Sequence, residues 1–278
     1  MKKALVTLAI GEEYSNEFEN LCRKNWQKYC DKYNYELICI KEPLDTSERA
    51  QKRSPAWQKC LVLSQNWSKN YDRIVWVDSD ILINPDAPDI CDNIPIEKVG
   101  ATEEYSNPTK SYYNTSLKRC YERWEKQGVN AIANYTPAEF YEKYGLEGKF
   151  DEVVQTGVMV FSPNYHKEIL ENVYYNYEEK GLNYEMRPLS YELLDKNLVH
   201  WIDNRFNLLW CYHEILHYPF LQNIKKSFGN KIFNKYNNVK QNCLQTTFIN
   251  SYFLHFVGRT KDIYLVNTEN TGIESLYC

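Results

Sequence analysis

Short apolar runs alternate with longer amphipathic stretches along most of the chain. We expect strands over 4–10, 36–40, 73–77, 153–161 and 200–202. Between them, apolar and aromatic residues recur at helical spacing, which predicts helices over 17–33, 57–67, 162–177 and 189–197. Strands that alternate with helices are typical of βαβ units. The predicted fold class is therefore α/β, with a mostly parallel central sheet flanked by helices.

The strand over 73–77 is expected at the centre of this sheet. After Arg73 it is continuously apolar, which is typical of a strand covered on both faces. It leads directly into Asp78-Ser79-Asp80.

Residues 104–150 differ from their surroundings. They are polar, rich in Tyr and helical in propensity, and we expect an insertion or lid over the sheet. The 278 residues are otherwise expected to form one domain, with a first half over about 1–103 and a second over about 151–278.

Composition narrows the classes of function. A formal charge of -4 provides no positive excess to hold a polyanion, so nucleic-acid binding is disfavoured. No apolar run approaches the roughly 18 residues of a transmembrane helix, and the run over 4–10 is too short for a secretory signal. Nine scattered cysteines without a CxxC pair indicate reduced thiols. We expect a soluble cytoplasmic protein.

Asp78 and Asp80 are the first candidates for chemistry. Residues i and i+2 of a strand share a face, so the two carboxylates lie side by side where the buried strand ends. Ligands of parallel α/β sheets bind at the carboxyl ends of the strands. Paired carboxylates there suit Mg²⁺ or Mn²⁺, which leave positions open for substrate phosphates.

Four segments, in order, resemble metal-dependent glycosyltransferases of the GT-A fold, which is Rossmann-like. Trp57-Gln58-Lys59 followed by the strand and Asp78-Ser79-Asp80 is similar to the Golgi galactosyl/mannosyltransferases and to the glycogenin and lipopolysaccharide galactosyltransferase family. The other three segments are 6–9 with Tyr14, 154–161 and 254–261. Gln155 departs from the family, which has Asn at that position.

The resemblance implies a set of ligands around the diphosphate of a nucleotide-sugar donor. Asp78, Asp80 and His255 would hold the metal, with Mn²⁺ preferred over Mg²⁺ for mixed oxygen and nitrogen ligands. Lys261 would meet the phosphates, and Gly258 would let the backbone approach them.

Further donor contacts follow from the same resemblance. Ala9 and Tyr14 belong to the segment that holds the nucleotide base, although simple packing is an equal alternative for Tyr14. Gln155 and Gly157 lie on the strand that faces the donor. Lys59 is a candidate partner for a phosphate or for the acidic pair, with an exposed helix lysine as the alternative.

Glu192 is the candidate catalytic carboxylate. By resemblance it faces the sugar or the acceptor hydroxyl, and a surface helix glutamate is the alternative. An inverting enzyme needs such a general base, whereas the resemblance favours retention. The expected activity is transfer of a hexose from a nucleoside diphosphate sugar, such as a UDP-sugar, to a glycan or lipid-linked glycan.

His213-Glu214-Ile215-Leu216-His217 is a competing motif. HExxH is the zinc site of many metalloproteases, which makes a zinc hydrolase the alternative activity. Pro219 would end the helix, and no glutamate occurs between Glu214 and Glu269 to serve as a further ligand. We therefore favour structural or acceptor-pocket histidines.

Two other interpretations remain open. Seven Lys/Arg and no acidic residue occur between Ile215 and Lys261, so the Lys225–Lys240 segment is a candidate for contact with an anionic membrane, with a solvated face as the alternative. A non-catalytic nucleotide-sugar or carbohydrate-binding module is the third class of function.

Overall fold

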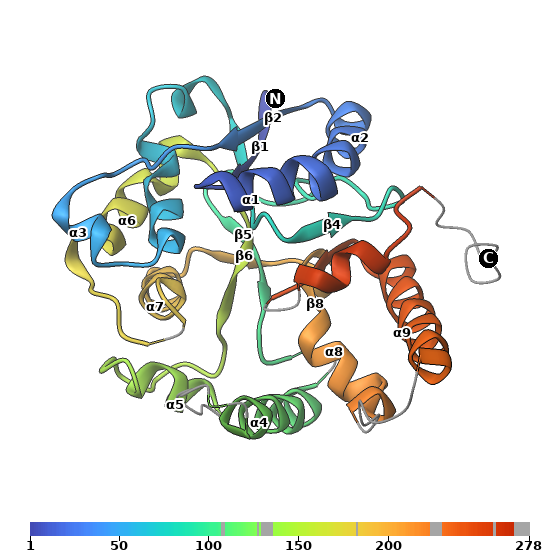
Figure 1. The fold of residues 1–278 in the computed structure, drawn as a ribbon. Helices are drawn as coiled ribbons and strands as arrows, with labels where there is room; N and C mark the ends of the chain where they lie inside the picture. The colour runs from blue at the N-terminus through green and yellow to red at the C-terminus, as the bar shows by residue number, and fades with distance from the viewer. Residues whose placement is uncertain are drawn as a thin grey trace.

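A six-stranded sheet forms the centre of the molecule, in the order β2-β1-β3-β6-β5-β7 (Figure 1). The computed structural model describes residues 1–106, 109–126, 128, 136–181, 183–222, 230–257 and 260–269. The strands are β1 (Lys3–Leu8), β2 (Tyr35–Ile40), β3 (Arg73–Val77), β5 (Val99–Glu103), β6 (Val154–Phe161) and β7 (Val199–Trp201). Only β6 runs against its neighbours in this sheet. The predicted α/β class with a mostly parallel sheet is confirmed.

A second, three-stranded sheet was not predicted from the sequence. It has the order β4-β9-β8 and consists of β4 (Ile81–Ile83), β8 (Leu208–Leu209) and β9 (Phe253–His255). Because β4 follows the acidic triplet directly, this sheet ties the triplet to the last part of the chain.

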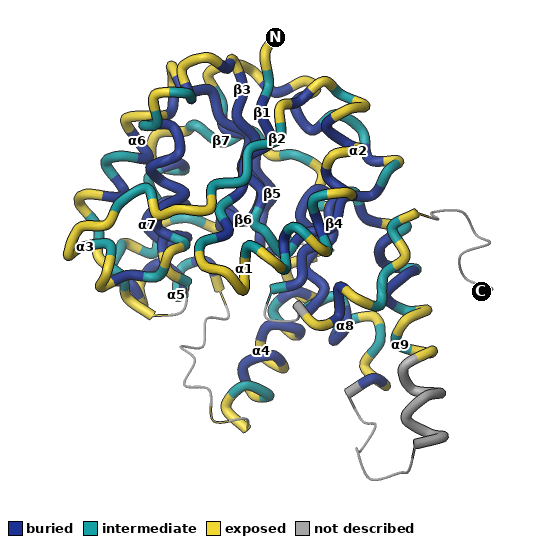
Figure 2. The backbone as a smooth tube through the Cα atoms, turned by 45° about the horizontal axis from the view of Figure 1, so that its top comes forward, coloured by how far each residue is buried: buried dark blue, intermediate teal, exposed yellow. Residues whose placement is uncertain are grey.

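Helices cover both faces of the central sheet. Helical structure runs without a break through α1 (Glu12–Glu17), a π-helical turn (Phe18–Cys22) and α2 (Arg23–Tyr33). The others are α3 (Glu48–Gln51), α4 (Lys110–Lys126), α5 (Pro137–Glu142), α6 (Pro163–Asn176), α7 (Met186–Asp195), α8 (Trp210–His217) and α9 (Asn230–Asn250). Figure 2 shows the inner strands, such as β3, β5 and β6, buried between helices whose outer faces are exposed. One apolar cluster joins α2 to the second sheet, and another joins β3 and β6 to α6 and α7.

The helix expected over 57–67 is wrong in type. Residues Pro55–Ser64 form a 3₁₀ helix, in which every side chain from Trp57 to Leu63 is buried. Because the stretch from Trp57 to Leu63 has no solvent-exposed face, an amphipathic period does not determine its conformation. Packing against α6 does.

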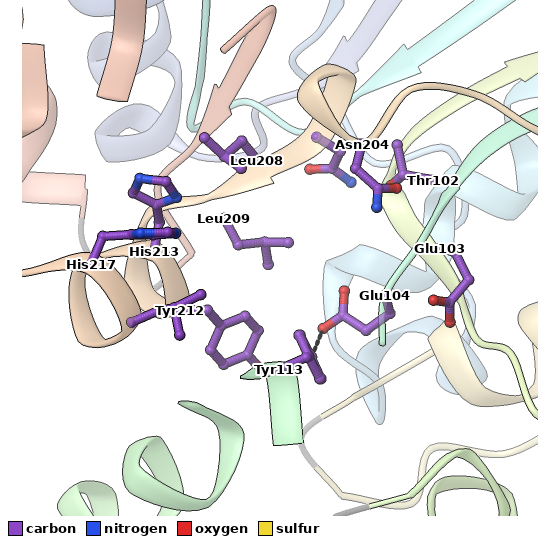
Figure 3. Close-up of a pocket in the computed structure, with 12 residues that line it drawn as sticks. Thr102, Glu103, Glu104, Tyr113, Asn204, Leu208, Leu209, Tyr212, His213 and His217 are labelled. Carbon is purple, nitrogen blue, oxygen red and sulfur yellow. Dashed lines mark hydrogen bonds between the residues drawn. The ribbon is translucent and has the colours of Figure 1, made fainter. Parts of the chain in front are cut away.

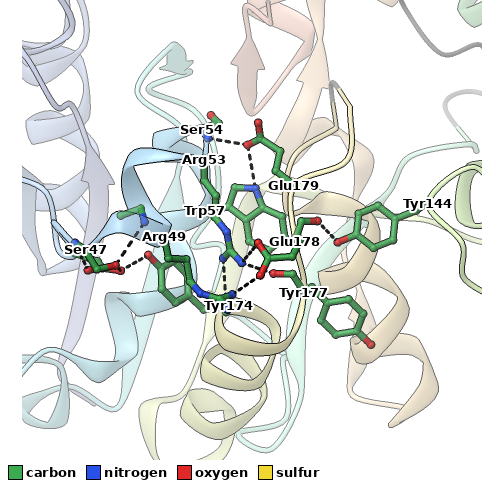
Figure 4. A network of polar contacts seen from close by, with 12 residues as sticks. Ser47, Arg49, Arg53, Ser54, Trp57, Tyr144, Tyr174, Tyr177, Glu178 and Glu179 are labelled. Atoms are coloured by element: carbon green, nitrogen blue, oxygen red, sulfur yellow. Dashed lines mark hydrogen bonds and ion pairs between the residues drawn. The ribbon is translucent and has the colours of Figure 1, made fainter.

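A polar network holds this 3₁₀ helix in place (Figure 4). The Arg53 guanidinium donates to the Tyr174 carbonyl at 2.7 Å and to Glu178 at 2.9 Å. Glu179 accepts from the Ser54 amide at 2.6 Å and from the Trp57 indole at 3.2 Å. The network fastens the segment that carries Lys59 to the end of α6.

The region over 104–150 has its own apolar cluster, built on Tyr105, Tyr113, Tyr121, Phe140 and Tyr141. Its helix α4 packs against α8. The aromatic character that set this region apart in the sequence is thus internal packing.

Two further observations concern the whole chain as far as it is described. None of the described helices is long and apolar enough to cross a membrane. The eight described cysteines are free thiols.

Candidate active site

Asp78 and Asp80 lie just beyond the carboxyl end of β3. The fully buried strand delivers them to the edge of the sheet, where their side chains are 29% and 25% exposed. The Asp78 amide donates to the Gly157 carbonyl at 2.8 Å, and the Asp80 carbonyl accepts from the Phe256 amide at 3.0 Å. Both backbone bonds fix the direction of the carboxylates.

His255 comes to the same place from the far end of the chain. It lies on β9, directly opposite Ile81 of β4. Its Nε2 lies 3.1 Å from Asp80 Oδ1 and 3.9 Å from Asp78 Oδ2. Its Nδ1 lies 2.9 Å from Asn207 Oδ1, whose amide nitrogen in turn donates to Gln155 at 2.7 Å. Asn207 therefore sets the orientation of the ring.

His255 and the two carboxylates stabilise one another's charged forms. Burial alone would lower the pKa of His255, but the negative charges of Asp80 and Asp78 outweigh it and raise that pKa. Burial likewise opposes ionisation of Asp80, while His255 brings the pKa of the carboxyl below its usual range. The three groups lie as an anionic pair bridged by an imidazole.

Lys59 is buried beneath Asp78. Its ammonium lies 3.2 Å from Asp78 Oδ1, 2.8 Å from Glu185 Oε1 and 3.2 Å from the Thr156 carbonyl. Burial works against the charge, but Asp78 and Glu185 raise the pKa of Lys59. Burial also raises the pKa of Glu185, against the effect of Lys59. Of the two roles expected for Lys59, these contacts are those of a partner to the acids.

Gly157 and Gln155 complete the floor of the site. A Cβ on residue 157 would lie 2.5 Å from His255 Cε1 and 2.8 Å from His255 Nδ1. Only glycine lets the ring pass this close to β6. Gln155 Oε1 accepts from the Gly157 amide at 2.5 Å and from the Asn207 amide, and so holds β6 and Asn207 together.

The remaining predicted site residues lie apart from this cluster or outside the described residues. Ala9 is buried after β1, Tyr14 is 60% exposed on α1, and Lys261 is exposed in a 3₁₀ helix. Glu192 on α7 accepts from the Tyr177 hydroxyl at 2.5 Å and pairs with Lys196. Gly258 lies outside the described residues.

The basic Lys225–Lys240 segment is described only in part. Residues 223–229 and the side chains of 230–237 lie outside the description. Lys240 forms an ion pair with Asp262 at 2.5 Å.

A pocket opens beside the acidic cluster (Figure 3). Asn207, the partner of His255, is one of the residues that line it. The others come from β5 and the residue after it, from α4, from β8 and the segment before it, and from α8: Thr102, Glu103, Glu104, Tyr113, Asn204, Leu208, Leu209, Tyr212, His213, Leu216 and His217.

The HExxH residues do not form a zinc site in this arrangement. His213 and His217 lie side by side in the pocket, with ring centroids 4.1 Å apart, and α8 ends at His217. Glu214 is buried, 2% exposed, with an Arg123 nitrogen 4.0 Å away. Among the described residues, no third metal-ligating side chain joins the two histidines. The geometry favours the pocket interpretation of these histidines.

The donor set of Asp78, Asp80 and His255 fits a divalent cation chemically, since two carboxylates and an imidazole suit Mn²⁺. As the side chains lie, His255 is hydrogen-bonded to Asp80, and no trio of His, Cys, Asp or Glu in the described ranges is arranged to hold a metal ion. A cation would have to take the place of the proton on His255 Nε2.

Comparison with solved structures finds a similar fold. A glycosyltransferase involved in the glycosylation of the major capsid of PBCV-1 matches over 95% of this chain and 100% of its own, with a TM-score of 0.50 and 14% identity. The chain has a glycosyltransferase fold. No family model and no curated protein sequence matches it.

Two other glycosyltransferases align less closely. The bifunctional enzyme WbbM has 13% identity over 99% of this chain and 51% of its own, with a TM-score of 0.43. GlyE of Streptococcus pneumoniae TIGR4 has 11% identity over 92% and 55%, with a TM-score of 0.46. The likeness to the PBCV-1 glycosyltransferase, at 14% identity, shows the fold alone, so the reaction must be argued from the site.

Three residues at the site were missed from the sequence: Glu185, Asn207 and Glu104. No motif marks them, and each is recognised only once the fold brings it to Lys59, His255 or the pocket. A single glutamate before a helix does not show in the sequence that its side chain is buried, so Glu185 could not be recognised.

Proposed function

We propose that the protein transfers a hexose from a nucleoside diphosphate sugar, specifically a UDP-sugar, to a hydroxyl of a glycan or lipid-linked glycan. The observation that carries the proposal is the convergence of Asp78, Asp80 and His255 at the carboxyl end of β3. In a sheet of this kind that edge is where ligands bind, and the fold is one that a glycosyltransferase uses.

Asp78, Asp80 and His255 would hold Mn²⁺, or Mg²⁺ in its place. When bound, such an ion supplies positive charge that stabilises a departing diphosphate. The chain's own residues prepare the site: Lys59 forms an ion pair with Asp78, and Asn207 turns His255 toward the carboxylates. Lys261, exposed beyond β9, would add positive charge to the phosphates.

The stereochemical part of the proposal is retention, and it rests on the family resemblance. Glu192 remains the proposed carboxylate near the sugar or acceptor. Its bond from Tyr177 holds it in one orientation. Contact of the Lys225–Lys240 segment with a membrane and a cytoplasmic location also stay proposals.

The test is thermal unfolding with UDP-, GDP- and CMP-sugars, each with and without Mn²⁺. A ligand at 100 times its dissociation constant stabilises the native state by about 2.7 kcal/mol. We expect a Mn²⁺-dependent shift with UDP-sugars, which Asp80→Asn abolishes while the melting temperature without ligand changes little. Asp92→Asn, at an exposed turn, is the matched control.

A shift that survives Asp80→Asn would contradict the metal assignment. Stabilisation by Zn²⁺ alone, lost on His213→Gln, would instead support the hydrolase alternative.

A further inference from the structure

The pocket shown in Figure 3 adjoins the acidic cluster but is not part of it. Asn207 belongs to both, because it lines the pocket and bonds to His255. A molecule in the pocket would therefore lie next to a donor held at Asp78 and Asp80.

Three residues that line this pocket each have a buried side-chain oxygen with no hydrogen-bond partner among the described residues: Thr102 Oγ1, Glu103 Oε2 and Glu104 Oε2. Their residues are 2%, 9% and 7% exposed. The second oxygen of each carboxylate is satisfied, because Glu103 Oε1 accepts from the Tyr105 and Val153 amides at 3.0 Å, and Glu104 Oε1 accepts from the Tyr113 hydroxyl. Buried polar groups normally have partners. A hydrogen-bonding ligand would supply them.

The pairing of β5 with β6 is irregular where the pocket begins. Thr102 pairs with Gln155, whereas Ala101 before it pairs with Met159. Irregularities of this kind in a sheet are enriched next to active sites.

The opposite wall is aromatic and apolar. Tyr212, His213 and His217 face the carboxylates together with Leu209 (Figure 3). Burial lowers the pKa of His213 to about 3, so this ring is uncharged at neutral pH. None of the twelve lining residues is Lys or Arg. The pocket thus offers hydrogen-bond acceptors, ring faces and negative charge.

We infer that this pocket binds the acceptor as an uncharged sugar ring, whose hydroxyls donate to Glu104, Glu103 and Thr102, and that the two carboxylates exclude acidic acceptors. The inference rests on the proposed function, which it deepens by naming the class of acceptor. A sugar presents several hydroxyl donors on one side and C–H groups on its faces, which match the two walls. An acidic sugar would bring a like charge to Glu103 and Glu104.

The test measures binding directly, without turnover. Saturation-transfer NMR is recorded above pH 7, where Glu104 is ionised, with the methyl glycosides of glucose, galactose, mannose and glucuronic acid. We expect at least one neutral glycoside to bind and the glucuronide not to bind. Glu104→Gln keeps an acceptor for Tyr113 but loses the charge, and should weaken binding of the neutral glycoside roughly tenfold. The same substitution should also reduce the difference in affinity between the neutral glycoside and the glucuronide.

A second variant fills the pocket. Leu216 lines it and is half-buried on α8, so Leu216→Trp should abolish glycoside binding while the Mn²⁺-dependent shift with UDP-sugar remains. Glu168→Gln, exposed on α6, is the control and should bind like the wild type.

The outcomes separate the two proposals. Glycoside binding unaffected by Glu104→Gln and Leu216→Trp, or tighter binding of the glucuronide, would overturn the acceptor assignment even if the UDP-sugar shift is present. Absence of binding by every neutral glycoside, in a protein that hydrolyses UDP-sugar, would overturn it as well. If the wild type binds a neutral glycoside but shows no Mn²⁺-dependent thermal shift with UDP-sugar, the result would count against the proposed function and not against the acceptor pocket.

Discussion

At the scale of single residues, Gly157 leaves no room in the site for a larger side chain. Its missing Cβ would meet the His255 ring at 2.5 Å and Gln155 Oε1 at 3.0 Å. We expect Gly157→Ala to displace His255 and to remove the Mn²⁺-dependent thermal shift with UDP-sugar. Overpacking of this kind costs about 1–3 kcal/mol of stability, which urea unfolding would measure.

Gly100→Ala is the matched control for that substitution. Gly100 is also in the central sheet, and a Cβ there would meet Ile94 and, at 3.2 Å, Val160 Cβ, neither of which is a site residue. It should cost comparable stability and keep the donor shift. A Gly157→Ala protein that still shows the full shift would mean that His255 has no role in holding the donor.

Lys59 shows what the sequence could and could not predict about a single residue. Its position before the acidic triplet made it a candidate site residue, but the sequence did not decide whether its partner is a phosphate or an acid. The structure gives it Asp78 and Glu185. Glu185 could not be found in advance, because its approach to Lys59 depends on how α7 packs against the sheet and not on any local pattern.

At the scale of elements, five of the six central strands were predicted from the sequence, whereas β5 and the three strands of the second sheet were not. Strands such as β3 and β6 carry enough consecutive apolar residues to be recognised, whereas β4, β8 and β9 have two or three residues each. Strands that short exist through pairing with distant segments. The second sheet, and with it the position of His255 opposite Ile81, therefore needed the structure.

Helix α2 holds the acidic triplet through the strand that follows it. Asn25 makes a reciprocal pair with Ile83, donating to its carbonyl at 2.6 Å and accepting from its amide at 2.7 Å. Asn25→Leu keeps the size but leaves both buried backbone groups unpaired, at about 1–3 kcal/mol for each. We expect a lower urea midpoint and a weaker donor shift, because β4 would no longer be fixed beside Asp80.

A nearby position on α2 provides the control for Asn25→Leu. Gln27 is exposed on the same helix, so Gln27→Leu should leave the urea midpoint nearly unchanged. Equal effects of the two substitutions would show that the helix surface, and not the bond to Ile83, determines stability there.

At the scale of the whole molecule, the free energy of unfolding should depend on pH through two groups in the same pocket. Acidification acts on stability in opposite directions through them. Burial lowers the pKa of His213 to about 3 in the folded state, against about 6.5 in an unfolded chain. As pH falls below about 6.5, the unfolded chain binds this proton first, so the contribution of His213 to stability is lost.

Glu104 acts the other way. Burial raises its pKa to about 7, despite the hydrogen bond from Tyr113, so the folded state binds the proton first and gains stability as pH falls from about 7 to 4.5.

Urea midpoints measured between about pH 6.5 and pH 4.5 would separate these two groups. Relative to the wild type, His213→Gln should lose less stability on acidification, since its unfolded chain has one proton fewer to gain. Glu104→Gln should lose more, because the compensating uptake by the folded state is gone. Parallel pH profiles for the wild type and both variants would show that neither group is buried as the pocket requires, and would remove the electrostatic basis for selecting an uncharged ligand.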